Sequence, residues 1–292
     1  MALLLRSLLS FMEVVMSIQV LEKVGEERAT VQLHVSYSQV YTYLLCPMKY
    51  AHNYVFGTLQ EHKPVPLIFG RAIHKAAEHY YLCLQDTGVV ADVAELEQAF
   101  EKCFSDEIDH SDVPILFKKG QTAEDLQDMG KQLIQLFHAE IKPQKIVAVE
   151  LPFCVSIPDY FGTGNLPIKL VGYFDLIESD GEGSYQIGEL KTSAQKFSSL
   201  RLEYDLQPTV YSYALSQMKL APTNESFLVR YDVLVKTKKP AFEQYFVIRN
   251  GSDYDRLVHL LNQVLRAIEN RLFYRNYGWQ CQDCQFKKTC LS

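Results

Sequence analysis

The chain has 292 residues, of which 48% are hydrophobic and 22% charged. This balance is typical of a globular protein and excludes disordered, collagenous and low-complexity classes. Its 29 basic and 35 acidic side chains give a net charge of −6, which argues against a protein that holds nucleic acid through a broadly basic surface. The length suits one large domain, or one domain that carries an insertion.

The N-terminal residues do not match a membrane span or a signal peptide. The first stretch is apolar, but Arg6 and Glu13 interrupt it, and a cleavable signal would need a cleaner apolar run. Met12 and Met16 are alternative start residues. We therefore expect residues 1–30 to be a leader of uncertain structure, a cytoplasmic location and no membrane partner.

The first half of the chain predicts helices. Apolar residues at helical spacing predict a helix over residues 36–56, which Pro47 should interrupt. A second helix is expected to start at Gly70, and amphipathic stretches at about 92–107 and 122–141 predict two more.

From residue 145 onward the pattern changes to alternating apolar residues, which is typical of strands. The order of elements predicts an α/β protein with a central mixed β-sheet flanked by helices. We expect a single domain at 31–292, with a helical insertion at about 75–143 and a C-terminal cysteine segment at 279–292. The expected elements are strands at 147–155, 168–178 and 185–192, a helix at 203–219, strands at 226–236 and 242–249, and a helix at 253–274.

Two carboxylates and one lysine are expected to converge on the predicted sheet. Glu189 and Lys191 are two apart on one strand, so they point to the same face. Asp175 lies on the preceding strand, within cross-strand reach. Such groups are costly to bury but suit a site for Mg²⁺ or Mn²⁺, with the backbone carbonyl of Leu190 as a further ligand. The alternative is a surface hairpin with a weak Glu–Lys ion pair.

Three of the seven cysteines, Cys281, Cys284 and Cys290, stand close together at the end of the chain. A Cys-x-x-Cys spacing lets two thiolates reach one metal, and a fourth ligand is then needed. Cys46 is the candidate, although spacing alone cannot connect it. The other three cysteines, Cys83, Cys103 and Cys154, are expected to be small core residues.

Several motifs together resemble the RecB-like branch of the PD-(D/E)XK nuclease superfamily. Gly-Tyr-Phe-Asp and Ile-Gly-Glu-Leu-Lys-Thr-Ser resemble its core, with Phe174 in place of the proline. Gly70 to His74, Gln207 to Tyr211, and the segment from Tyr37–Ser38 to Cys46–Pro47 resemble three further motifs of this branch, in the same order.

The resemblance implies a restriction-endonuclease-like core and assigns roles to residues. It implies that His74 joins Asp175 and Glu189 in holding the cation, that Lys191 acts on the water or the transition state, and that Gln207 and Tyr211 contact DNA or steady the active site. Glu150 is expected either behind the metal ligands or in a structural ion pair.

The cysteine pattern also resembles a subset of this branch. AddB-type and CRISPR-associated RecB-like exonucleases have one early and three late cysteines around a 4Fe–4S cluster, which implies such a cluster on Cys46, Cys281, Cys284 and Cys290. Zinc suits four thiolates equally well by their number.

The expected function is a metal-dependent deoxyribonuclease, an exonuclease on single-stranded DNA or DNA ends. Its expected setting is DNA repair, recombination or CRISPR adaptation, with a helicase, recombination or adaptation partner. The alternatives are a catalytically silent DNA-binding subunit stapled by the cluster and, less favoured, a redox protein. An idle site would not require the full set of Asp, Glu, Lys and His.

Overall fold

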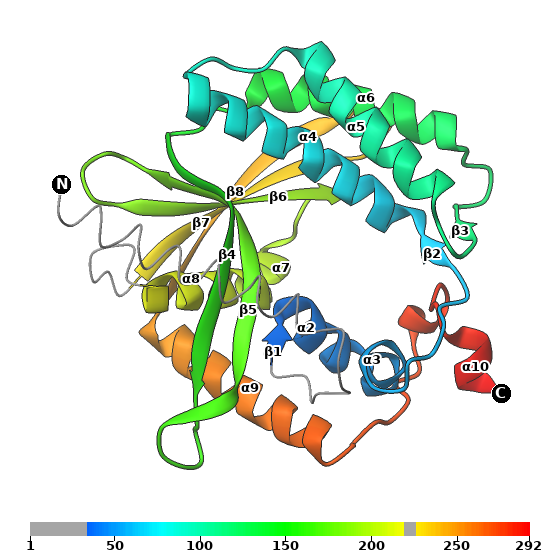
Figure 1. Ribbon diagram of the computed structural model, residues 1–292, viewed down its shortest axis with the longest axis vertical. Helices are drawn as coiled ribbons and strands as arrows, with labels where there is room; N and C mark the ends of the chain where they lie inside the picture. Colours follow the sequence, from blue (N-terminus) through cyan, green and yellow to red (C-terminus); the bar gives the residue numbers. More distant parts are fainter. Residues whose placement is uncertain (1–33, 219–225) are drawn as a thin grey trace.

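The computed structural model describes residues 34–218 and 226–292 (Figure 1), so the expected leader at 1–30 lies outside the described residues. None of the described helices is long and apolar enough to cross a membrane. In chain order the elements are β1 (His34–Ser36), α2 (Tyr37–Leu45), α3 (Pro47–Tyr54), β2 (Lys63–Pro64), α4 (Val65–Thr87), α5 (Val93–Asp109), β3 (Ile115–Leu116), α6 (Ala123–Glu140), β4 (Lys145–Pro158), β5 (Asn165–Ser179), β6 (Tyr185–Ser193), α7 (Ser199–Tyr204), α8 (Leu206–Met218), β7 (Ser226–Val235), β8 (Ala241–Asn250), α9 (Gly251–Glu269), the short 3-10 helix η2 (Trp279–Cys281) and α10 (Lys287–Leu291).

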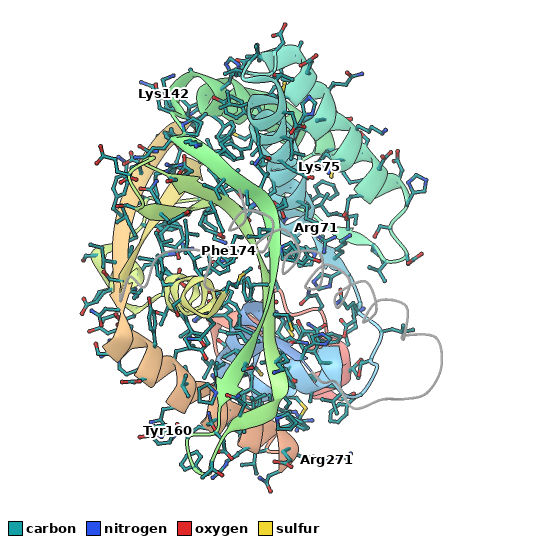
Figure 2. The ribbon with its side chains drawn as sticks, turned by 60° about the vertical axis from the view of Figure 1, so that its left-hand side comes forward. Arg71, Lys75, Lys142, Tyr160, Phe174 and Arg271 are labelled. Atoms are coloured by element: carbon teal, nitrogen blue, oxygen red, sulfur yellow. The ribbon has the colours of Figure 1, made fainter. Side chains whose placement is uncertain are left out.

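The main sheet is mixed, as the sequence predicted. Its strands follow the order β1-β5-β6-β7-β8, and β4 pairs with β5 as a long antiparallel hairpin. β6 and β7 are parallel, whereas β5–β6 and β7–β8 are antiparallel. β2 and β3 form a separate two-stranded sheet. Figure 2 shows Phe174 midway along the long hairpin and Tyr160 at its tip, next to α9.

Helices cover the sheet on both sides, and each side has its own apolar core. α4, α5 and α6 pack together on one side of the sheet, and α8 and α9 pack on the other side (Figure 1). This arrangement confirms the predicted fold class, a central mixed sheet flanked by helices. The division into a nuclease domain with an insertion at about 75–143 stays a prediction.

Local sequence signals explain where most helices begin. Ser36, Asp92, Thr122 and Asn250 each form a capping box with the residue three positions later. Pro47 interrupts the first predicted helix, as expected, because proline is tolerated only in the first turn of the next one.

The largest differences from the predicted boundaries are in three helices. α4 begins at Val65 rather than Gly70, because Pro66 fits its first turn. The helix predicted at 203–219 is split at Asp205, which is extended and whose carboxylate accepts hydrogen bonds from the hydroxyls of Tyr37 and Tyr231. The last long helix ends at Glu269, five residues early, since the chain turns through Arg271 with a φ of 54°.

A buried ionic network ties four neighbouring strands together. Arg230 on β7 pairs with Glu178 on β5 at 2.6 Å and with Asp232 on its own strand at 2.9 Å. Their side chains are at most 4% exposed. Gln186 on β6 and Gln244 on β8 donate to the same two carboxylates. Each charge is therefore paired and hydrogen-bonded, which burial requires.

Replacing Arg230 with Leu should destabilise the protein by about 3 kcal/mol or more, because two carboxylates would stay buried without their cation. Urea unfolding followed by circular dichroism measures this loss. The matched control is Lys196→Met, which breaks the exposed ion pair with Glu243 and should leave the midpoint nearly unchanged. Similar losses in both variants would contradict a stabilising role for the network.

Candidate active site

The candidate site lies at a gap along one edge of β5. β4 pairs with β5 along its whole length, so β1 and β6 must share the opposite edge. β1 pairs with β5 up to Val171, and β6 pairs only from Leu176 onward. Residues 172–175 therefore have an open edge, and Asp175 is the last residue before β6 joins the sheet.

The backbone of β6 lines this gap beside Asp175. The Leu190 N–H donates to Oδ2 of Asp175 at 3.0 Å. In an extended strand the N–H and C=O of one residue point to the same edge. The carbonyl of Leu190 is therefore directed into the gap, next to the Asp175 carboxylate.

His74 and Glu150 reach the gap from two other elements. His74 on α4 has its Nδ1 3.4 Å from Oδ2 of Asp175. Glu150 on β4 lies opposite Asp175, since Val149 pairs with Leu176 and Leu151 with Phe174. One ligand atom from each of His74, Glu150 and Asp175 lies within 4.8 Å of the others. An imidazole and two carboxylates at this spacing fit a divalent cation.

Glu150 has an unusual backbone and an altered acidity. Its φ of 46° is left-handed, a strain of roughly 1 kcal/mol or more for a residue with a side chain. Burial, and then the charge of Asp175, raise the pKa of Glu150 to about 7. Within residues 34–218 and 226–292 no basic side chain forms an ion pair with it. The geometry favours a cation-binding position over the structural ion pair that the sequence left open.

Glu189 stands beside this group rather than in it. It is 2% exposed, and its Oε1 pairs with Lys191 and accepts from Gln207 Nε2 at 2.8 Å. Its Oε2 is buried without a hydrogen-bond partner among the described residues. Burial, and then Asp175, raise the pKa of Glu189 to about 8. An orphaned buried oxygen is costly, so it also fits a cation.

Gln207 and Tyr211 hold the Glu189 side of the site. Gln207 Nε2 also donates to the Tyr211 hydroxyl at 2.8 Å, one helical turn away on α8. Burial disfavours the charge on Lys191, but Glu189 and Asp175 outweigh it and raise the pKa of Lys191. Lys191 therefore stays a cation beside the carboxylates.

The four cysteines singled out in the sequence line one cavity. Cys46 lies between α2 and α3, and Cys281, Cys284 and Cys290 belong to the C-terminal segment. Figure 1 shows α10 next to α3. No three of these sulfurs lie within 4.8 Å of one another. Cys83, Cys103 and Cys154 are partly buried elsewhere.

The sequence placed Glu150 behind the metal ligands or in an ion pair, and it did not indicate the open edge of β5. One signal for Glu150 was present, because it occupies a polar position in the alternation of Val147, Val149 and Leu151. Its place opposite Asp175 depended on the register of β4, which the sequence alone did not provide.

Comparisons with known proteins agree with this fold. A family model described as the PD-(D/E)XK nuclease superfamily matches residues 34–291. A solved structure from Eubacterium rectale, described as a candidate exonuclease, is 14% identical, and the match covers 88% of each chain with a TM-score of 0.52. That likeness shows a shared fold.

A second solved structure, of the protein SSO0001, is 13% identical. The match covers 87% of this chain and 94% of that one, but its TM-score of 0.36 supports no argument. No curated protein matches the chain.

Replacing Glu150 with Gln should stabilise the metal-free protein near pH 8 but not near pH 5. A raised folded-state pKa gives stability that is complete below the ordinary value of 4.5 and is lost as the pH rises through about 7. Gln removes that loss. In addition, Mn²⁺ should stabilise the wild type more than the variant.

Thermal unfolding at both pH values, with and without Mn²⁺, measures both effects. Glu140→Gln, at the exposed end of α6, is the matched control and should behave like the wild type. Equal stabilisation of wild type and Glu150→Gln by Mn²⁺ would rule out Glu150 as a ligand.

Proposed function

The chain belongs to the PD-(D/E)XK nuclease superfamily, and from that premise we propose that it hydrolyses phosphodiester bonds in DNA with Mg²⁺ or Mn²⁺. The observation that carries the proposal is the convergence of His74, Glu150 and Asp175 at the open edge of β5, next to Glu189 and Lys191. A site with this much negative charge and so few cations favours binding of a divalent ion.

Each residue has a distinct role in this proposal. His74, Asp175, Glu189 and the Leu190 carbonyl hold the cation, and Glu150 is added to that set. The bound ion would lower the pKa of a water molecule and offset charge on the phosphate. Lys191 orients the attacking water and stabilises the negative charge that develops in the transition state. Gln207 fixes the rotamer of Glu189 through its 2.8 Å hydrogen bond.

The finer assignment is a RecB-like exonuclease that acts on single-stranded DNA or DNA ends. The motifs from Tyr37 to Tyr211 support the branch, and the description of the Eubacterium rectale protein of similar fold as a candidate exonuclease supports the exonuclease assignment. In this proposal the enzyme works in the cytoplasm in repair, recombination or CRISPR adaptation, with a helicase, recombination or adaptation partner. Thiols that bind a metal must stay reduced, and the cytoplasm is a reducing compartment.

The silent-subunit alternative is disfavoured by the chemistry of the site. Glu150 and Glu189 both have raised pKa values because burial and Asp175 oppose their charge. A fold that made no use of a cation would gain stability by replacing either of them.

Replacing Lys191 with Ala should lower the rate of single-stranded DNA cleavage by at least about 10²-fold, because the charge opposite the transition state is lost. End-labelled DNA is incubated with Mn²⁺, Mg²⁺ or EDTA, and products are resolved on a gel. Lys191→Met serves as a second variant that preserves more of the packing.

The control is Lys196→Ala, an exposed lysine 66% accessible on the neighbouring loop, which should cleave normally. Wild-type cleavage in EDTA, or full activity of folded Lys191→Ala, would contradict the mechanism. A wild type that binds DNA but cleaves nothing would favour the silent subunit.

We also propose that Cys46, Cys281, Cys284 and Cys290 hold a 4Fe–4S cluster. All four thiols line one cavity, so they can reach a shared metal group. Lys49, Arg275 and Lys287 line the same cavity, and their charge would offset that of the thiolates. The cluster would join the α2–α3 segment to the end of the chain.

Anaerobically purified protein should contain iron and acid-labile sulfide, and Cys281→Ala should lose both and unfold at a lower temperature. Cys103→Ala is the matched control, because Cys103 lies on α5 and does not line this cavity. Elemental analysis distinguishes iron from zinc. One zinc ion per chain in the wild type, without sulfide, would establish the alternative.

A further inference from the structure

Two hollows adjoin at the catalytic lysine. One, of about 600 Å³, extends along the open edge of β5 past Tyr173. The other, of about 860 Å³, lies between α2 and α7 and reaches Tyr41, Arg201 and Tyr204. Lys191 and Gln207 line both hollows. A chain laid across Lys191 would therefore occupy a hollow on each side of the bond to be cut.

Tyrosine side chains line the second hollow from two separate elements. Tyr41 on α2 is 49% exposed, and Tyr204 at the end of α7 is 73% exposed. Neither hydroxyl takes part in the site described above. Large aromatic surfaces left open beside a catalytic group are available to a ligand with flat, apolar faces.

Hydrogen bonds to Asp205 hold the two segments that carry these rings. Tyr37 lies below Tyr41, with ring centroids 5.8 Å apart, and its hydroxyl donates to Asp205 at 3.2 Å. Asp205 directly follows Tyr204 and also accepts from the buried Tyr231 at 3.0 Å. The same carboxylate therefore anchors both walls of the hollow to the sheet.

Charge alone offers little affinity for DNA here. Among the described residues that line either hollow, the basic side chains are His34, Lys191 and Arg201, and the whole chain carries a net charge of −6. Phosphate contacts are then few, and most of the affinity must come from another source. Stacking of bases on aromatic rings provides such a source for single strands.

We propose that Tyr41 and Tyr204 form a stacking clamp for unpaired bases, so that single-stranded DNA is the preferred substrate. The proposal rests on the proposed nuclease function and adds the residues that select the substrate. Arg201, exposed and with its guanidinium carbon 3.5 Å from the ring centroid of Phe197, lies where it can meet a phosphate between the clamped bases. In a duplex the base faces are already stacked, and the clamp has nothing to hold.

The test measures binding separately from cleavage. The full chain in EDTA is titrated into a labelled single strand of about 12 nucleotides, within the usual site size of such grooves, and fluorescence anisotropy gives Kd. Tyr41→Ala and Tyr204→Ala should each raise Kd on the order of tenfold. Tyr41→Phe and Tyr204→Phe keep the ring and should bind like the wild type.

Phe246→Ala is the matched control, because Phe246 is 57% exposed on β8 and lines neither hollow. It should leave Kd unchanged. A 2-aminopurine base in the strand adds a direct readout, since its fluorescence is quenched on stacking and should recover in the alanine variants.

Unchanged Kd in both alanine variants would overturn the clamp, as would duplex DNA bound as tightly as the single strand. Tighter binding of RNA of the same sequence would overturn the choice of DNA. Cleavage with Mn²⁺ is scored independently. Tyrosine-dependent binding without any cleavage would uphold the clamp and reject the nuclease, whereas cleavage that needs Lys191 but not the tyrosines would do the reverse.

Discussion

Three carboxylates share one gap in the sheet with a single lysine, and this concentration of like charge is the constraint on which the site depends. Asp175 contributes to the raised pKa values of both Glu150 and Glu189. Lys191 pairs with Glu189, but one ammonium cannot balance three carboxylates. The raised pKa values of Glu150 and Glu189 therefore reflect an excess of negative charge that Lys191 alone does not offset.

The sheet creates the gap in which this charge collects. Because β1 stops at Val171 and β6 starts at Leu176, the edge of β5 between them is free of backbone partners. Gly172 lies in this free stretch, and a Cβ there would come within 2.6 Å of the Phe153 ring. The close packing of Phe153 against the strand thus favours glycine three residues before Asp175.

Parts of the chain far apart in sequence complete the site. α4 brings His74 over the gap because its apolar side packs on α5, α6 and the sheet. Asp205 interrupts a helix, and α8 then begins at Leu206, so that Gln207 stands in its first turn and donates to both Glu189 and Tyr211. Cys46, directly after α2, lines one cavity with the C-terminal cysteines. Near it, the Met48 N–H donates to the Tyr274 carbonyl at 3.0 Å. The first and last described segments therefore support each other next to the site.

The sequence by itself determined the kind of fold and much of the chemistry. Alternation and helical periodicity predicted the five long strands and most helices, because these patterns depend only on which residues face a core. Spacing of two residues on one strand was enough to place Glu189 and Lys191 together, and one helical turn was enough for Gln207 and Tyr211.

Only the tertiary structure decided the rest, because register and long-range packing leave no local pattern. The register of β4 set Glu150 opposite Asp175. The helix break at Asp205 had a local signal in Pro208, which is tolerated only in a first turn, but the hydrogen bonds that Asp205 accepts from Tyr37 and Tyr231 had none. Tyr41 and Tyr204, from two separate helices, came to line one hollow. Each of these depends on residues more than 20 positions apart in the chain, as in the pairs Glu150–Asp175 and Asp205–Tyr231, and the free energy of such contacts exists only once the chain has folded.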